Sequence, residues 1–199
     1  MPRGEQKEQT RQRILEAAGR SFRREGFDGV GVDGVSKEAG VTSGAFYVHF
    51  GSKAAAFRES VVQGVAEVVA GVRQLQAQHG AGWWREFVHF YLGDKRKCEL
   101  ARSCGLQSLT PEVARADGPS RSAFTAELRK VAGAIAAGPE SAEAPATTDE
   151  AYAALSALIG AVTLARAVDD AALAQRIAAA AERALLPAPG KQIRSRGKR

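Results

Sequence analysis

The chain has 199 residues, of which 45% are hydrophobic, so it is long enough to bury a core and wholesale disorder is excluded. It has no run of about 18 apolar residues, so we expect no membrane span. Its first residues are polar, so we expect no signal peptide and a cytoplasmic location. The net charge is +6, but the segment 187–199 supplies +5 of it, while residues 1–53 hold nine basic and seven acidic residues. We expect that segment to be a flexible basic tail with only a sequence-blind attraction to phosphates.

Three helices are predicted in the first quarter of the chain. A first amphipathic helix is expected over about residues 10–25, because apolar side chains recur every four residues at Ile14, Ala18 and Phe22. Gly26 is expected to end it. Two short helices are then expected over about residues 33–39 and 43–50.

The rest of the chain is also predicted to be helical. Ser52 is the expected N-cap of a long fourth helix, which fades near His79. A polar connector is expected at Gly93–Lys97, and a flexible loop at Gly138–Thr147. The further helices are expected at about residues 83–92, 106–116, 120–137, 149–168 and 170–186. About nine helices and no sheet predict an all-α fold.

The stretch Val32–Phe50 has the spacing of a helix-turn-helix. Such a motif needs a small residue where the helices cross, a glycine four residues later that can adopt positive φ, and apolar residues that pin both helices. Ser36 and Gly40 meet the first two requirements. The apolar requirement is met by Val35, Ala39, Val41 and Phe46. Thr42 stands at the N-cap of the second helix, so that the first turn of this helix can face base edges or phosphates.

The stretch Gly26–Lys53, GFDGVGVDGVSKEAGVTSGAFYVHFGSK, resembles the DNA-binding signature of the TetR/AcrR family of transcriptional regulators. The matching parts are the G-F after the first helix, the A-G-V turn, the aromatic-x-His-Phe segment and the final Ser-Lys. The resemblance implies a helix-turn-helix DNA-binding domain at residues 1–53 and a helical ligand-binding and dimerisation domain at residues 54–186. It further implies a homodimeric repressor that binds a pseudo-palindromic operator in double-stranded DNA and is released by a small, largely apolar effector.

The family's DNA-binding roles, transferred position by position, fall on the turn and the second helix of the motif. Thr42 is expected to cap this recognition helix and to touch a phosphate. The resemblance places Ser43, Gly44 and Ala45 toward the major groove and Tyr47, His49 and Lys53 on the DNA backbone. Because Ser, Gly and Ala offer sparse direct readout, Lys37, water and DNA shape are expected to add specificity. Phe46 and Phe50 are expected to be core residues.

Aromatic residues are concentrated at residues 83–91, although only 7% of the residues in the chain are aromatic. Core packing explains most of them, but the family would place a mostly apolar ligand pocket here. The candidate lining residues are Trp84, Phe87, Phe90, Tyr91 and Phe124. The candidate polar anchors are Gln107, Thr110 and Arg166.

The last two predicted helices are rich in small apolar residues. In TetR-like proteins the corresponding pair packs against its two-fold mate as a four-helix bundle. The residues expected at this interface are Leu155, Leu158, Ile159, Val162, Leu173, Ile177 and Ala181. Ordinary packing within one chain is the alternative.

Other activities have weaker support. Cys98 and Cys104 are too few for a disulfide framework, but they neighbour several basic residues, so a thiol-based redox or electrophile sensor is the alternative regulator. Gly29–Gly34 spells G-x-G-x-x-G, but no strand precedes it, which disfavours a nucleotide site. The three histidines lack metal spacing and no catalytic motif occurs, so neither an enzyme, a cofactor nor a metal is expected.

Overall fold

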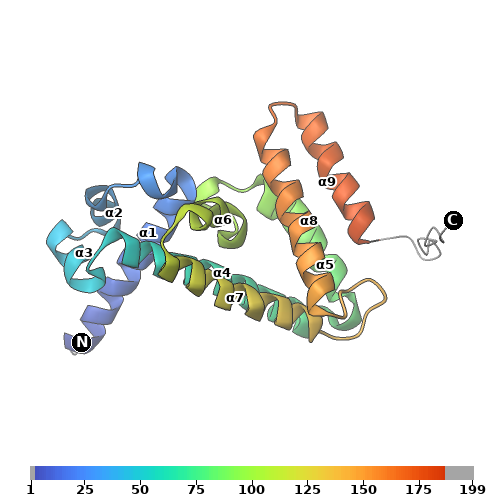
Figure 1. The fold of residues 1–199 in the computed structure, drawn as a ribbon, viewed down its shortest axis with the longest axis horizontal. Coiled ribbons are helices and arrows are strands. Elements are labelled where there is room, and N and C mark those ends of the chain that lie inside the picture. Colours follow the sequence, from blue (N-terminus) through green and yellow to red (C-terminus); the bar gives the residue numbers. More distant parts are fainter. Residues whose placement is uncertain (1–2, 187–199) are drawn as a thin grey trace.

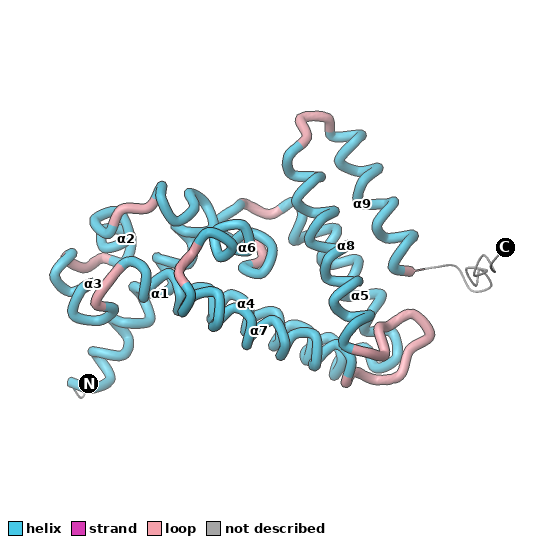
Figure 2. The backbone as a smooth tube through the Cα atoms, viewed as in Figure 1, coloured by secondary structure: helices cyan, strands magenta, loops and turns pink. Residues whose placement is uncertain are grey.

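The computed structural model describes residues 3–186, in which all the regular structure is helical (Figures 1 and 2). The α-helices are α1 (Arg3–Gly29), α2 (Val32–Ala39), α3 (Ser43–Phe50), α4 (Lys53–His79), α5 (Trp83–Phe90), α6 (Gly105–Arg115), α7 (Gly118–Ala136), α8 (Thr148–Ala167) and α9 (Ala171–Leu185). The predicted all-α fold is confirmed. The expected basic tail lies outside the described residues.

The helices form two groups joined by long helices (Figure 1). Helices α1, α2 and α3 pack together at one end of the molecule, and we call this group the reading head. Helices α4 and α7 lie side by side and run away from it. Helices α8 and α9 form a hairpin at the other end, and α6 lies between the two groups. No helix described in residues 3–186 is both long enough and apolar enough to cross a membrane.

Side-chain caps explain where several of the helices begin. Ser52 accepts a hydrogen bond from Ala55 N at 3.0 Å, as predicted, and of the two candidate caps Asp169 and Asp170 it is Asp170 that accepts one from Leu173 N at 3.0 Å. Thr147 caps α8 in a reciprocal capping box with Glu150. Each such cap contributes about 1 kcal/mol, because it satisfies an amide that has no partner within the helix.

Helix α1 is longer than predicted and is broken rather than ended at Gly26. The expected range was about residues 10–25, whereas the helix extends over Arg3–Gly29. Gly26 adopts φ 74° and ψ 177°, a conformation that only glycine adopts at little cost. The chain turns sharply there and then resumes helical hydrogen bonding, so that the segment Gly29–Gly34 joins two helices without a strand.

Two hydrophobic cores lie within residues 3–186. The first is the core of the reading head, and it includes Ile14, Phe22, Val35, Phe46, Phe50, Phe57 and Val61. Leu109 and Val113 of α6 are also part of this first core, so α6 is packed into the reading head. The second core lies among α4 to α9 and contains both tryptophans. Each fully buried leucine or phenylalanine stabilises the fold by about 1.5–3 kcal/mol.

The expected connector at Gly93–Lys97 is largely helical. Residues Tyr91–Lys95 form a π-helical turn that continues α5. The side chain of Arg96 donates from Nε to the carbonyl of Leu92 at 2.7 Å, which provides a partner where the regular helical pattern changes. Single π-turns of this kind occur often beside functional sites.

Candidate nucleic-acid interface

The turn between α2 and α3 has the conformation that the sequence predicted. Gly40 adopts φ 68° and ψ 39°, the left-handed region, and its amide donates to Lys37 O at 3.1 Å. The next amide, of Val41, donates to Ser36 O at 2.9 Å. These two bonds satisfy carbonyls at the end of α2 and set the angle at which α3 leaves it. Ser36 is buried at the crossing, as a small residue must be.

Helix α3 presents one face to solvent and packs the other against the reading head. Thr42 accepts a hydrogen bond from Ala45 N at 3.2 Å, which confirms its predicted capping role. Phe46 and Phe50 are buried, as predicted. Tyr47 is 51% exposed, and its neighbour Val48 is 76% exposed. An apolar side chain this exposed on an ordered helix is available to a partner.

Val48 is absent from the residues inferred from the family resemblance. It follows Gly44 by four residues, so the two share the solvent face of α3. The buried pair Phe46 and Phe50 already indicated which face was free, and this signal was present in the sequence.

The remaining candidate DNA-binding residues differ in whether their polar groups already have hydrogen-bond partners among the described residues. Ser43 donates from its hydroxyl to the carboxylate of Asp33 at 2.5 Å, which ties α3 to α2. His49 is half-buried, and its Nδ1 is buried without a hydrogen-bond partner among the described residues. Lys37 is exposed on α2.

Lys53 points into the reading head rather than away from it. Its ammonium donates to the carbonyls of Phe27 at 3.0 Å and Val30 at 3.1 Å. It also lies 4.3 Å from the centroid of the Phe27 ring, within the range of a cation–π interaction. The expected contact of Lys53 with the DNA backbone is therefore corrected. Its ammonium already makes three interactions within the chain, so Lys53 stabilises the packing of the reading head instead.

Glu38 of α2 connects two helices of the reading head. Its carboxylate accepts hydrogen bonds from Arg20 Nε at 2.7 Å and from Ser21 Oγ at 3.1 Å, both on α1. Burial alone would raise the pKa of Glu38, but the hydrogen bonds from Arg20 and Ser21 outweigh it, so that the pKa lies below its ordinary value. The carboxylate is thus held in its charged form, and it joins α1 to α2.

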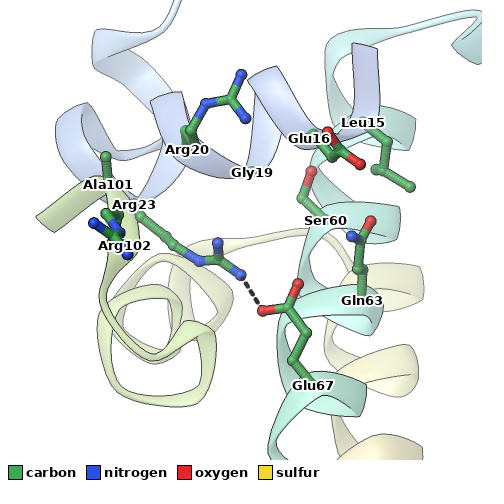
Figure 3. Close-up of a pocket in the computed structure, with 10 residues that line it drawn as sticks. All are labelled: Leu15, Glu16, Gly19, Arg20, Arg23, Ser60, Gln63, Glu67, Ala101 and Arg102. Atoms are coloured by element: carbon green, nitrogen blue, oxygen red, sulfur yellow. Dashed lines mark hydrogen bonds and ion pairs between the residues drawn. The ribbon is translucent and has the colours of Figure 1, made fainter. Parts of the chain in front are cut away.

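A cleft of about 230 Å³ separates α1 from α4 behind the reading head (Figure 3). Figure 3 shows Arg23 of α1 pointing at Glu67 of α4, and the two atoms Nη2 and Oε2 are 3.1 Å apart. Arg23 is mostly buried and Glu67 is exposed, so this ion pair links the reading head to the long helix at the edge of the cleft.

The structure brings some of the predicted ligand residues together. Phe87, Phe90 and Tyr91 line a cavity of about 80 Å³ between α4, α5 and the π-turn. Trp84 does not line the cavity itself, but it is buried and stacks on Phe87 with ring centroids 5.6 Å apart. The other lining residues are Gly64, Glu67, Val68, Gly71, Leu75, Lys95 and Cys104.

The other predicted ligand residues do not line this cavity. Gln107 donates to Thr163 Oγ1 at 3.1 Å, and the hydroxyl of Thr110 bonds back to its own helix. Phe124 is partly buried between the two cores. Arg166 donates to the carbonyls of Lys95 and Cys98. The prediction that the polar anchors Gln107, Thr110 and Arg166 and the aromatic Phe124 share one pocket with Phe87 is corrected for this cavity, because helical spacing does not reveal which neighbours a side chain meets.

The predicted interface residues fall on opposite sides of α8 and α9. Leu155, Leu158 and Val162 are buried in the core of their own chain, so the alternative of packing within one chain is correct for these three. Leu173 is 39% exposed, while Ile159, Ile177 and Ala181 are half-buried. The outward face that the sequence missed carries Ala153, Ala157, Gly160 and Leu164, of which Leu164 is 60% exposed.

Comparisons with known proteins agree with this geometry. Residues 14–59 match the model described as bacterial regulatory proteins, tetR family. A TetR-family transcriptional regulator from Agrobacterium tumefaciens has a similar structure, with a TM-score of 0.72 and 19% identity over 90% of this chain and 98% of that one. The reduced form of NemR from E. coli gives a TM-score of 0.69 and 20% identity over 89% of this chain and 95% of that one.

A third similar structure is a TetR-family transcriptional regulator from Cytophaga hutchinsonii, with a TM-score of 0.68 and 18% identity over 94% of this chain and 98% of that one. At such identities the likeness demonstrates a shared fold. No curated protein matches the sequence.

Proposed function

Because the chain belongs to the TetR family of bacterial regulatory proteins, we propose that it is a cytoplasmic, homodimeric repressor that binds a pseudo-palindromic operator and is released by a small, largely apolar effector. The observation that carries the proposal is the solvent face of α3, capped by Thr42 and backed by two buried phenylalanines. A recognition helix presented in this way fits the major groove.

Each exposed group of α3 has a role that its chemistry supports. The amides at the start of α3 and its positive dipole end favour a phosphate. Tyr47 and His49 are proposed to contact the DNA backbone, and Ala45 to face base edges. Val48, the most exposed apolar residue of the helix, suits a thymine methyl group. Lys37 on α2 supplies an exposed cation nearby.

The second copy of the chain is proposed to pack on the outward face of α8 and α9. Small residues at Ala157 and Gly160 allow close approach of two backbones, and a Cβ at Gly160 would meet nothing within 4 Å in the single chain. Leu164 and Leu173 are the exposed apolar side chains of this surface. Exposed leucines of this kind are typical of surfaces that a partner covers. A two-fold contact here would hold two reading heads toward one duplex.

The effector is proposed to enter the 80 Å³ cavity and widen it, because ligand pockets usually measure about 300–1,000 Å³. The cavity walls are mostly apolar, and Tyr91 lies beside Cys104 among the lining residues. Burial raises the pKa of Tyr91 well above its ordinary value, so the phenol stays protonated as a donor. Its hydroxyl is buried without a hydrogen-bond partner among the described residues, which favours an effector with one accepting group on an apolar body.

The experiment is selection of duplexes from a random library by the full chain, followed by affinity measurement at several salt concentrations. We expect an inverted repeat to be enriched. Tyr47→Ala should weaken binding at least about tenfold on every sequence, because a hydrogen bond to a charged group contributes about 1.5–3 kcal/mol. Tyr152→Ala, a half-buried tyrosine on α8, is the control and should bind as the wild type does. Failure to enrich any duplex would contradict the proposal.

A thiol-based regulator is the second candidate, and one contact favours it. The guanidinium Nη2 of Arg166 lies 3.4 Å from Cys98 Sγ, so a cation stands beside the thiol, as is typical of reactive cysteines. Cys98 is half-buried, whereas Cys104 is buried. Under this function a mild thiol oxidant would release the operator from the wild type but not from Cys98→Ser. An unchanged response in Cys98→Ser would exclude Cys98 as the sensor.

A further inference from the structure

The break in α1 leaves a backbone amide that a distant helix satisfies. The positive φ of Gly26 interrupts the hydrogen-bond ladder, and the amide of the next residue, Phe27, points away from α1. That amide donates to Oε2 of Glu112 on α6 at 3.0 Å. The donor and the acceptor are 85 residues apart in sequence. This hydrogen bond, which we call the α6 clamp, joins the reading head to the rest of the chain.

The position of Gly26 makes room for the clamp. A Cβ at this residue would lie 3.2 Å from Oε1 and 3.3 Å from Cδ of the Glu112 carboxylate, closer than nearly all real Cβ contacts. Glycine is therefore required twice here, once for the left-handed conformation and once for the close approach of the carboxylate.

Phe27 is held from both sides of its backbone. Its amide is bound by Glu112 of α6, and its carbonyl accepts a hydrogen bond from Lys53 at the first residue of α4. Its ring packs edge-on against Phe57 of α4 with centroids 5.2 Å apart. The end of α1 is thus fixed relative to both helices that lead into the second core.

Helix α6, which carries Glu112, also packs into the core of the reading head. Leu109 and Val113, which flank Glu112 along the helix, are 0% and 4% exposed and belong to the first hydrophobic core. At the other end of α6, Cys104 lines the 80 Å³ cavity and Gly105 contacts Gly64 of α4. One short helix therefore touches the cavity at its start and the reading head at its end.

We propose that Glu112 is a positioning residue that fixes the orientation of the reading head and thereby sets the half-site spacing that the dimer accepts. The inference rests on the proposed operator binding and goes beyond it, since it assigns spacing selectivity to a residue that does not touch DNA. A two-fold dimer reads two half-sites whose separation depends on how its heads are held. With the clamp intact, one spacing fits; without it, each reading head can move relative to α6 and accept several spacings.

The test measures affinity for a series of duplexes in which the selected half-sites are moved apart or together by one to three base pairs. We expect the wild type to prefer one spacing at least about tenfold, in line with the strength of a hydrogen bond to a charged acceptor. Glu112→Ala should reduce that preference to less than about threefold by raising affinity for the other spacings relative to the best one. Glu112→Gln keeps an acceptor oxygen and should restore the preference.

Two controls separate the clamp from general effects on charge or stability. Glu143→Ala removes a carboxylate that is 19% exposed and paired with Arg85, close to the 18% exposure of Glu112 and its pairing with Arg115. Arg115→Ala removes the ion pair of Glu112 but leaves the clamp. Both variants should keep the wild-type spacing preference. Amide hydrogen exchange at Phe27 should accelerate at least about tenfold in Glu112→Ala and remain slow in Glu112→Gln.

Failure of the positioning role of Glu112 can be distinguished from failure of the proposed operator binding. A wild type that enriches no duplex would contradict operator binding itself. A wild type that prefers one spacing, together with a Glu112→Ala variant that keeps this preference, would overturn the positioning role. If Glu112→Ala does not fold, Glu112→Met replaces it, because methionine has a similar length and no strong acceptor. An unchanged spacing preference in Glu112→Met would likewise overturn the inference.

Discussion

Gly105 of α6 and Gly64 of α4 meet backbone to backbone. A Cβ on Gly105 would stand 2.8 Å from Cα of Gly64, and a Cβ on Gly64 would stand 3.2 Å from Cα of Gly105. Side-chain rearrangement cannot relieve a contact between two backbones. The two helices therefore cross at the closest distance that their residues permit, beside the small cavity.

This crossing predicts that Gly105→Ala destabilises the protein. The added methyl group forces α6 away from α4, and overpacking of this kind costs about 1–3 kcal/mol. Urea denaturation followed by circular dichroism gives the free energy of unfolding. Gly133→Ala on α7 is the control, since its Cβ would meet nothing within 4 Å, and it should raise stability by up to about 1 kcal/mol. A Gly105→Ala variant as stable as the wild type would contradict the tight crossing.

The exposed face of α3 predicts that Ala45 and Val48 affect which sequence is bound. Val48→Ser removes two methyl groups that would meet a thymine methyl, so preference at one base pair should relax by about 1–3 kcal/mol. Ala45→Ser should change preference at another base pair in the same half-site. Repeating the duplex selection with each variant measures both effects. Identical selected sequences for both variants and the wild type would remove α3 as the reading surface.

The proposed dimer contact on the outward face of α8 and α9 predicts that Leu164→Arg gives a monomer. A charge placed within a packed interface loses its hydration without gaining a partner, which costs several kcal/mol. Sedimentation velocity should then give a monomer. Leu100→Arg is the control, because Leu100 is also exposed, at 46%, but lies outside α8 and α9. A dimeric Leu164→Arg variant would place the two-fold contact elsewhere.

The lowered pKa of Glu38 predicts a loss of stability in acid. Its folded-state pKa lies below the unfolded value of about 4.3, so its contribution is fully present above that value and disappears as the pH falls through the folded-state pKa. Glu38→Gln should therefore be less stable than the wild type at neutral pH, and the difference should shrink below about pH 4. Urea midpoints across this range measure it. A difference that is constant with pH would contradict the role of the charged carboxylate.

The reading head was predictable because its determinants act within a few residues. The left-handed glycine at position 40, the cap at Thr42 and the buried pair Phe46 and Phe50 all depend on local spacing, and the structure has each of them as expected. Helix caps at Ser52 and Asp170 were predictable for the same reason. Val48 was equally accessible to this reasoning, since it lies opposite the buried face.

Tertiary structure decided what helical periodicity leaves open. Helices α8 and α9 are apolar on more than one side, so the spacing of Leu155, Leu158 and Val162 did not reveal that these leucines and valine face inward while Leu164 faces outward. Similarly, no local rule relates Glu112 to Phe27 or turns Lys53 toward two carbonyls. The physical reason is range: caps and turns are set by neighbours within about four residues, whereas burial and the partner of a charged group depend on which distant helix packs against it.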